Sequence, residues 1–387
     1  MLKRTLKPLI SNSFFLFGAR GVGKTSLIYE ILKNRPTLFI DLLDPTEFES
    51  LTLNSGELGA RLKNAESDYE WIVLDEIQKA PALLDVVHQF IERKKLKFAL
   101  TGSSARKLKR GGANLLAGRA YTSHLFPLTF EELGESFNLD QILSWGSLPK
   151  IFSIETNEEK KIFLQSYAQT YVKEEIQSEQ IVRRLDPFRR FLAVAAQSNG
   201  QIINYAHIAR DVGASDVTVQ SYFTILEDTL LGLLLEPFHR SIRKRQRENP
   251  KFYFFDTGVQ RALSKTLDVK LKPQTYAYGA AFEHFIVCEI ARLCSYRRND
   301  FTFSYLRTKD DAEIDLIIER PGMPTALVEI KSSASIDSHD ISALRRFLPD
   351  FPKANAYCLS TDPNPKRIDK IECLPWADGI REILGTT

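Results

Sequence analysis

The sequence predicts an α/β chain in three parts. The first part is a parallel sheet that carries a phosphate-binding loop, the second contains a winged helix-turn-helix, and the third is an α/β domain around an acidic site. Three observations predict this order: a glycine-rich loop between an apolar run and a helix, an apolar run that ends in two carboxylates, and a late helix–strand–strand series with spaced acidic residues. Because 387 residues exceed one ordinary core, we expect domains at residues 1–155, 156–265 and 266–387.

The glycine-rich loop joins a strand to a helix. Phe14 to Phe17 form an apolar run, a complete G-x-x-x-x-G-K-[ST] pattern follows, and Ser26 to Leu32 place apolar residues at helical spacing. Glycines permit close backbone approach, so successive N–H groups and the helix N-terminus can face a polyphosphate. Lys24 would reach the outer phosphates of ATP and the Thr25 hydroxyl would bind Mg²⁺. The alternative is an ordinary glycine turn. The expected nucleotide contacts in the loop are Gly18, Arg20, Gly21, Val22, Gly23, Lys24, Thr25 and Ser26.

Two carboxylates follow the apolar run Trp71 to Leu74. Ligands bind at the carboxyl ends of strands in open α/β sheets, which is where Asp75 and Glu76 would lie. Asp75 would hold the magnesium ion through its water shell, and Glu76 would polarise the water that attacks the γ-phosphate. Two acidic residues that merely end a strand are the alternative.

Two further candidates belong to the same domain. Ser103, after the strand Lys97 to Leu100, could bind the attacking water or the γ-phosphate, or could only cap the next helix. Arg119 follows Gly118 and could act as an arginine finger, in cis or from a neighbouring subunit of a homo-oligomer, or could be an ordinary surface residue.

Composition and cysteine spacing limit which classes of protein the chain can belong to. Hydrophobic residues make up 43% and charged residues 26%, which is typical of a globular chain, and the net charge of +3 produces no strong global field. The four cysteines form no C-x-x-C pair and have no histidines at zinc-ligand spacing. No apolar stretch is long enough for a membrane span. We therefore expect a cytoplasmic protein with reduced thiols and no membrane partner.

Several motifs resemble one family of bacterial and archaeal proteins, the AAA-type ATPases with a C-terminal DUF4143 region. The resemblance spans nearly the whole chain and implies a P-loop ATPase domain of the additional-strand-catalytic-glutamate type. Ser147 stands where the family commonly has a second glycine, which would alter a turn but no chemistry. The matching motifs are residues 18–25, 72–76, 101–104, 118–119, 126–133 and 145–149.

The middle of the chain predicts a winged helix-turn-helix. Two short helical stretches, Tyr205 to Val212 and Ser215 to Glu227, precede two apolar strands near residues 230–235 and 252–255. Five positive charges in eight residues occupy the expected wing and could follow a phosphate backbone, DNA more readily than RNA. A solvated charge run or a packing lid would explain the same pattern. These residues are Arg240, Arg243, Lys244, Arg245 and Arg247.

The C-terminal region carries a second acidic pattern. Glu283 lies on an amphipathic helix, Asp315 lies in the strand Glu313 to Glu319, and Glu329 and Lys331 project from one face of the next strand. This order resembles the PD-(D/E)xK nucleases. Asp315 and Glu329 would bind one or two magnesium ions, Lys331 would position or activate water, and Glu283 would bind the metal or orient a ligand. The alternative is a salt bridge between the strands in a fold without activity.

Two functions follow from these patterns. The first is an ATPase whose nucleotide state is coupled to a nuclease-like domain that acts on nucleic acid. The second is an ATP-dependent switch or scaffold that binds a protein through a catalytically inactive nuclease-like fold.

Overall fold

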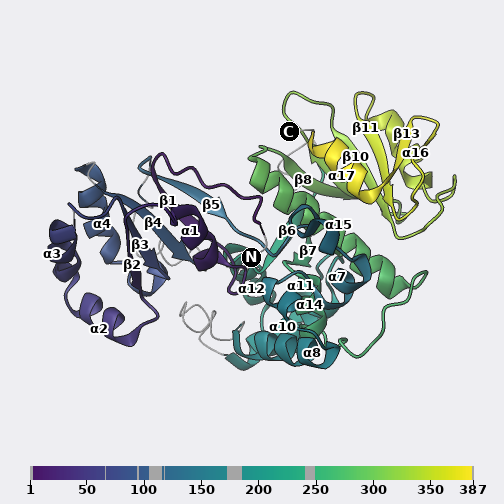
Figure 1. The fold of residues 1–387 in the computed structure, drawn as a ribbon. Helices are drawn as coiled ribbons and strands as arrows, with labels where there is room; N and C mark the ends of the chain where they lie inside the picture. The colour runs from purple at the N-terminus through teal and green to yellow at the C-terminus, as the bar shows by residue number, and fades with distance from the viewer. Residues whose placement is uncertain are drawn as a thin grey trace.

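The computed structural model describes residues 3–65, 67–93, 96–103, 116, 118–171, 185–239 and 249–385. Figure 1 shows one lobe formed by the N-terminal sheet and its helices, and a larger part formed by the middle helices and the C-terminal sheet. Within the described ranges, no helix combines the length and apolar character that a membrane span needs.

The first sheet has the strand order β2-β3-β4-β1-β5, and each neighbouring pair is parallel. This confirms the predicted parallel α/β sheet, in which β4 separates the loop-bearing strand β1 from the carboxylate-bearing strand β3. The strands are β1 (Ser13–Phe17), β2 (Thr37–Asp41), β3 (Trp71–Asp75), β4 (Lys97–Gly102) and β5 (Ala120–His124). The helices are α1 (Lys24–Leu32), α2 (Pro45–Leu53), α3 (Ser55–Ala65) and α4 (Leu83–Glu92).

Alternation along β1 explains why helices cover both faces of this sheet. Phe14 and Leu16 pack in one core with residues of α1, whereas Phe15 and Phe17 pack in another with residues of α3 and α4. All five residues of β1 are buried because successive side chains point to opposite faces and both faces are covered. The continuous apolar run in the sequence therefore reflects a central strand.

The middle of the chain is helical, as predicted. α11 and α12 match the two expected helices, and Ser215 caps α12 by accepting the N–H of Thr218 at 3.2 Å. The assignment of this unit as a winged helix stays a prediction. The helices are α6 (Phe130–Leu133), α7 (Leu139–Trp145), α8 (Asn157–Ser166), α10 (Leu185–Gln197), α11 (Tyr205–Val212), α12 (Asp216–Asp228) and α14 (Thr257–Leu263), and a π-helical turn spans Tyr167–Tyr171.

The second sheet has the strand order β12-β13-β11-β10-β9-β8-β6-β7. β6 and β7 form the antiparallel pair expected for the wing, but β6 also pairs in parallel with β8 through Glu236 and Pro237. The sheet thus runs across the expected domain boundary between residues 265 and 266. The strands are β6 (Gly232–Pro237), β7 (Lys251–Phe254), β8 (Thr302–Arg307), β9 (Glu313–Glu319), β10 (Ala326–Lys331), β11 (Asn355–Ser360), β12 (Lys366–Ile368) and β13 (Ile371–Pro375).

Helices cover both faces of the second sheet. α15 (Tyr276–Arg297) and α17 (Trp376–Leu384) share one core with Val328 of β10, and α16 (Ser342–Phe347) shares another with Leu327. The sequence analysis did not identify β12, β13 or α17, because short elements at the end of a chain carry little periodicity.

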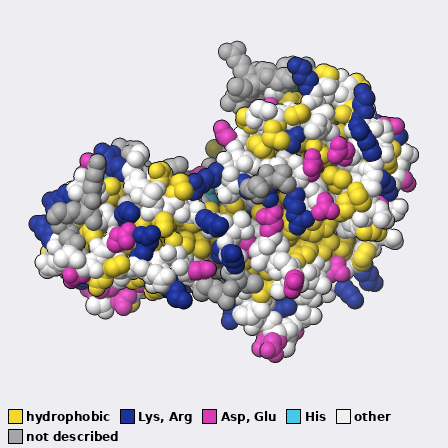
Figure 2. All heavy atoms as spheres, turned by 45° about the horizontal axis from the view of Figure 1, so that its top comes forward, with side chains coloured by type: hydrophobic (Ala, Val, Ile, Leu, Met, Phe, Trp, Pro, Cys, Tyr) yellow, Lys and Arg dark blue, Asp and Glu magenta, His cyan; other side chains and the backbone are white. Residues whose placement is uncertain are grey.

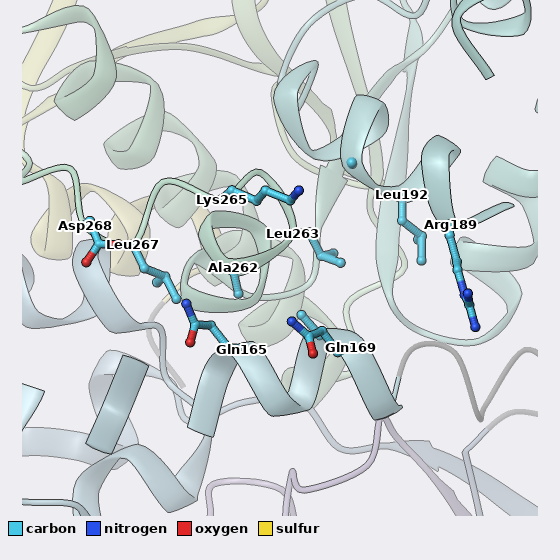
Figure 3. Close-up of a pocket in the computed structure, with 11 residues that line it drawn as sticks. Gln165, Gln169, Arg189, Leu192, Ala262, Leu263, Lys265, Leu267 and Asp268 are labelled. Carbon is cyan, nitrogen blue, oxygen red and sulfur yellow. The ribbon is translucent and has the colours of Figure 1, made fainter. Parts of the chain in front are cut away.

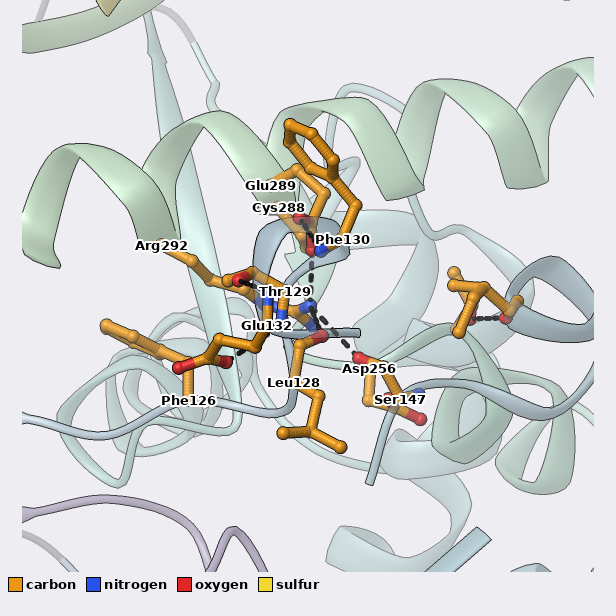
Figure 4. A network of polar contacts seen from close by, with 12 residues as sticks. Phe126, Leu128, Thr129, Phe130, Glu132, Ser147, Asp256, Cys288, Glu289 and Arg292 are labelled. Carbon is orange, nitrogen blue, oxygen red and sulfur yellow. Dashed lines mark hydrogen bonds and ion pairs between the residues drawn. The ribbon is translucent and has the colours of Figure 1, made fainter. Parts of the chain in front are cut away.

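A buried polar network joins α15 to α6, to the turn after α7 and to the start of α14 (Figure 4). Glu289 accepts the backbone N–H of Phe130 at 2.9 Å, and Arg292 donates to Glu289 at 2.8 Å and to the Ser147 hydroxyl at 3.1 Å. The Ser147 N–H donates to Asp256 at 2.7 Å. Two stretches that carry the family resemblance, residues 126–133 and 145–149, therefore meet at one helix.

Ser147 has a specific place in this network. Its hydroxyl accepts from Arg292, and a glycine at this position would leave the fully buried guanidinium with one acceptor fewer. Gly146 beside it adopts a positive φ of 76°, and a Cβ there would lie 2.0 Å from a carboxylate oxygen of Asp256. The turn therefore requires glycine at residue 146.

Candidate functional sites

The phosphate-binding loop lies between β1 and α1, at the carboxyl edge of the first sheet. Gly21 and Gly23 have φ values of 75° and 95°, and a Cβ on Gly18 would lie 2.3 Å from the carbonyl oxygen of Leu125. The backbone path therefore depends on glycine at each of these positions. Lys24 is 5% exposed and donates from Nζ to the carbonyl of Gly18 at 2.9 Å, so the ammonium group lies folded over the loop.

Asp75 lies directly against the start of α1. The Thr25 hydroxyl donates to Asp75 Oδ2 at 2.6 Å, and the Thr101 hydroxyl donates to Oδ1. Because β3 and β1 are both parallel neighbours of β4, their carboxyl ends lie at one edge of the sheet. A threonine hydroxyl and a carboxylate are hard oxygen donors of the kind that Mg²⁺ prefers, so these two residues fit the ion.

Glu76 faces Lys24 across the loop, with Oε1 3.6 Å from Nζ. Its φ of 60° is left-handed, a conformation that is unusual for a glutamate. Its N–H donates to the Thr101 hydroxyl at 3.0 Å, and Gln78 Nε2 donates to Glu76 Oε2 at 2.5 Å. The surrounding contacts thus hold this carboxylate in one orientation despite the backbone strain.

Ser103 belongs to the same group of residues. Its hydroxyl accepts from Gln78 Nε2 at 3.2 Å, so Gln78 links Ser103 to Glu76. Gln78 and Thr101 are functional candidates that our motif reasoning did not select. Thr101 lies near the end of β4, in the run of small residues at 101–104 that the sequence already indicated. Gln78 follows Glu76 by two residues, which is a weak signal without the structure.

Arg119 lies at the opposite edge of the sheet from the loop. Residues Ser13 and Ala120 pair at the start of β1 and β5, whereas Phe17, which precedes the loop, pairs with His124. Four residue steps from Ser13 to Phe17 place the two ends of the strand about 13 Å apart. Arg119 forms an ion pair with Glu92. A finger in cis therefore does not fit this geometry, and action from a neighbouring subunit stays a prediction.

Two side chains from outside the sheet hold the loop backbone. The Tyr167 hydroxyl donates to the carbonyl of Arg20 at 2.9 Å, and Arg4 Nη1 donates to the carbonyl of Val22 at 3.0 Å. Arg4 also donates to Glu132 at 3.1 Å and to the Tyr296 hydroxyl at 3.0 Å. The nucleotide loop is thereby tied to both the middle helices and the far end of α15.

The second candidate site lies where β9 and β10 diverge. Their ladder pairs Leu316 with Val328 and goes no further toward residue 315. There Asp315 Oδ2 accepts the N–H of Ile330 at 2.7 Å and so replaces the missing backbone partner. Burial first, and the carboxylates of Glu329 and Glu283 next, hold the pKa of Asp315 well above its usual range.

Glu329 and Lys331 contact one another beside Asp315. Lys331 Nζ lies 2.6 Å from Glu329 Oε1, while Glu329 Oε2 is buried and has no hydrogen-bond partner. Burial raises the pKa of Glu329, and the Lys331 ammonium opposes that shift. The structure therefore has an ion pair within β10, where we weighed a salt bridge between strands as the alternative to a metal site, and this pair satisfies only one of the two oxygens.

Glu283 turns toward β7. The Tyr253 hydroxyl donates to Glu283 Oε1 at 2.6 Å, and Lys251 Nζ lies 3.4 Å from the same oxygen. Lys251 also forms an ion pair with Glu313. Lys251 and Tyr253 were absent from our sequence-based site, because β7 lies outside the segment that carries the acidic motif. Glu313 lies in β9, within that segment, but was not selected either.

The acidic cluster contains carboxylate oxygens that could bind a metal ion, but few of these oxygens lie close together. Among the described residues, no three His, Cys, Asp or Glu side chains are arranged to hold a metal ion. The unpartnered Glu329 Oε2 beside the Asp315 carboxylate still fits a hard divalent cation, because both are oxygen donors and the orphaned oxygen is buried.

Two other regions are the basic segment expected as the wing and a cleft between the middle helices. The basic wing from Arg240 to Arg247 lies outside the described residues. On the face drawn in Figure 2, Lys and Arg side chains are interspersed with Asp and Glu. A cleft of about 630 Å³ lies between α8, α10 and α14, with Gln165, Gln169 and Lys265 at its wall (Figure 3). None of the expected site residues lines it.

Comparison with known proteins identifies three regions of the chain. Residues 11–134 match the model of an AAA domain, residues 136–270 match a domain of unknown function (DUF8612), and residues 278–378 match a domain of unknown function (DUF4143). An uncharacterized protein of Mycobacterium tuberculosis is 29% identical over 85% of this chain and 73% of its own length. An uncharacterized protein of Haemophilus influenzae is 22% identical over 49% of this chain and 52% of its own.

A solved structure, the replication initiator DnaA bound to AMPPCP and single-stranded DNA, is also similar. It is 16% identical, covers 57% of this chain and 83% of its own, and has a TM-score of 0.31, which is too low to support a structural argument. The AAA match agrees with the parallel sheet, the loop and the Thr25–Asp75 contact. The chain therefore carries a nucleotide-binding P-loop domain of the AAA type, followed by a C-terminal DUF4143 region.

Proposed function

We propose that this chain is a Mg²⁺-dependent ATPase whose nucleotide state controls a nuclease-like C-terminal domain that acts on nucleic acid, DNA in preference to RNA. The convergence of Lys24, Thr25, Asp75 and Glu76 at one sheet edge carries the ATPase part. The α15 helix carries the coupling part, because Tyr296 contacts the Arg4 that holds the loop, and Glu283 on the same helix belongs to the acidic cluster.

The ATPase mechanism assigns one task to each residue. Backbone N–H groups of the loop bind the phosphates, and Lys24 leaves the Gly18 carbonyl to pair with the β- and γ-phosphates. Thr25 and Asp75 would hold the magnesium ion, which supplies charge neutralisation of the phosphates. Glu76, oriented by Gln78, accepts a hydrogen bond from the attacking water and aligns it with the γ-phosphate.

Hydrolysis of Mg-ATP by the purified chain tests this assignment. Lys24→Ala and Glu76→Gln should each lower turnover by at least about 10²-fold, because each removes a group that acts on the reacting phosphate or water. Lys33→Ala and Glu30→Gln are matched controls at exposed positions of α1 and its end. Equal turnover in Glu76→Gln and the parent chain would refute the role of Glu76.

Arg119 would act on the nucleotide of a neighbouring subunit. Mixing tests this directly, because an Arg119→Ala subunit retains Glu76 and a Glu76→Gln subunit retains Arg119. Two inactive variants should regain ATP turnover when mixed. Failure to regain turnover would exclude a finger in trans.

In the C-terminal domain, Asp315 and Glu329 would hold a divalent cation that polarises the scissile phosphate. Lys331 would position the attacking water, and the arginines and Lys244 of the wing would bind the phosphate backbone. Cleavage of labelled DNA and RNA with Mg²⁺ or Mn²⁺, with and without ATP, tests this part. Asp315→Ala and Lys331→Ala should abolish cleavage while Asp300→Ala, at an exposed position, should retain it.

A second candidate function is an ATP-dependent switch or scaffold for a protein partner. The pairing of Lys251 with Glu283 and of Lys331 with Glu329 supports it, because paired carboxylates can serve structure alone. This candidate predicts ATP turnover without cleavage of either nucleic acid. ATP-dependent cleavage that disappears in Asp315→Ala would refute it.

A further inference from the structure

Lys251 is a buried lysine that contacts two carboxylates of the acidic cluster. It begins β7, its side chain is only 3% exposed, and it contacts Glu283 from α15 and Glu313 from β9. Burial alone would lower the pKa of Lys251, but the carboxylates of Glu283, Asp315 and Glu313 outweigh burial and raise it above its usual value. The lysine is therefore charged inside the acidic cluster.

The four carboxylates divide into two pairs. Glu283 and Glu313 share Lys251, and Tyr253 adds a hydrogen bond to Glu283 at 2.6 Å. Asp315 and Glu329 form no ion pair with Lys251, and Glu329 Oε2, on a side chain 94% buried, has no hydrogen-bond partner. A buried carboxylate oxygen without a partner is costly. Lys331 contacts only the other oxygen of Glu329, so Glu329 Oε2 stays open to a further cation.

We infer that Lys251 is a built-in counter-cation which occupies one half of the acidic site, so that the site takes one divalent cation, at Asp315 and Glu329, rather than two. Lys251 and Tyr253 are positioning residues, since they hold Glu283 on the β7 side of the cluster. The inference rests on the proposed metal site and reduces the number of its ligands, because Glu283 pairs with Lys251 and does not bind the metal.

The charges agree with this division. Lys251 and Lys331 are the two cations that contact these four carboxylates, so two of the carboxylates have no cation of their own, and one divalent cation would balance that pair. Without Lys251 three carboxylates would have no cation of their own, and Glu283 and Glu313 would be free to bind a metal. Removing the lysine should therefore increase metal affinity by about tenfold or more, or create a second site, because a positive charge within a few ångströms repels a cation in a buried environment.

Calorimetric titration of the full chain with Mn²⁺, without nucleotide, tests the inference. An Asp75→Asn background removes the carboxylate of the P-loop ion site. The parent should bind one ion, Lys251→Met should bind it at least about tenfold more tightly or bind two, and Lys251→Arg should match the parent. Lys366→Met is the matched control, because Lys366 pairs with Asp362 at 2.7 Å elsewhere in the domain.

The results of these titrations distinguish the role of Lys251 from the existence of the metal site. Two ions in the parent, or equal affinity and stoichiometry in the parent and Lys251→Met, would overturn the inference and leave the proposed metal site intact. No binding in the parent with binding in Lys251→Met would overturn the inference that the natural site takes one ion and would refute metal-dependent cleavage by the natural chain. No binding in either would overturn both. If Lys251→Met does not fold, Lys251→Gln removes the same charge, keeps a hydrogen-bond donor for Glu283, and tests the same point.

Discussion

Arg4 allows the connection between the nucleotide loop and the C-terminal domain to be measured. Its side chain is 7% exposed and its partner Glu132 is fully buried. Arg4→Met would remove the hydrogen bonds to the Val22 carbonyl and the Tyr296 hydroxyl and would leave the Glu132 carboxylate without its ion pair. Removal of one partner from a buried pair costs about 3–5 kcal/mol, so we expect a loss of unfolding free energy in that range.

Two variants separate the contribution of the Tyr296 hydrogen bond to this loss of unfolding free energy from that of the Glu132 ion pair. Tyr296→Phe removes one hydroxyl and should cost about 1 kcal/mol. Arg4→Met combined with Glu132→Gln leaves no uncompensated charge, so it should be more stable than Arg4→Met alone. Glu132 also accepts from the N–H groups of Thr5 and Thr129, which the glutamine oxygen can still satisfy in part.

Urea unfolding followed by tryptophan fluorescence is the assay, since Trp71 is fully buried in the core that also contains Leu6. Binding of a fluorescent ATP analogue to the same variants measures the effect on the loop, and Arg4→Met should weaken it because the Val22 carbonyl loses its donor. A loss below about 1 kcal/mol for Arg4→Met, or no recovery in the double variant, would refute the reasoning.

Three further predictions follow from single contacts. Burial raises the pKa of Glu289 from 4.5 to about 7 against the opposing effect of Arg292, so the folded chain holds the proton more strongly than the unfolded chain. The unfolding free energy should fall by up to about 3 kcal/mol as pH rises from 4.5 through 7, and Glu289→Gln should lack this fall in urea titrations across that range. Gly146→Ala should destabilise the chain by several kcal/mol more than Gly118→Ala in thermal unfolding, because both positions have positive φ but only Gly146 faces a clash. Gln78→Leu should lower ATP turnover with little change in nucleotide affinity, because it frees the carboxylate that aligns water; an equal loss of affinity would contradict this role.

Local patterns predicted much of the first domain. The run from Phe14 to Thr25 identifies a strand, a loop and a helix by itself, because glycine positions, apolar burial and helical spacing act over neighbouring residues. The run from Trp71 to Glu76 does the same for β3. The structure adds that β4 lies between the two strands and that the Thr25 hydroxyl donates to Asp75, so the two motifs meet at one edge of the sheet.

Other features could not be predicted from local sequence. Lys251 enters the acidic cluster because β6 pairs with β8 and carries β7 into the C-terminal sheet, and nothing near Lys251 in the sequence signals this. Arg119 was a finger candidate from its neighbour Gly118 alone, whereas strand pairing puts it at the far edge of the sheet.

The sequence by itself determined where the phosphate-loop motif and the acidic motif lie, since these motifs require particular side chains at short spacing. Tertiary structure alone decided what surrounds them. Arg4 donates to Tyr296, which lies 292 residues later in the chain, and Glu283 forms an ion pair with Lys251, which lies outside the acidic motif. Such contacts depend on how sheets and helices pack, because burial lets distant segments satisfy one another's charges and hydrogen bonds wherever the fold brings them together.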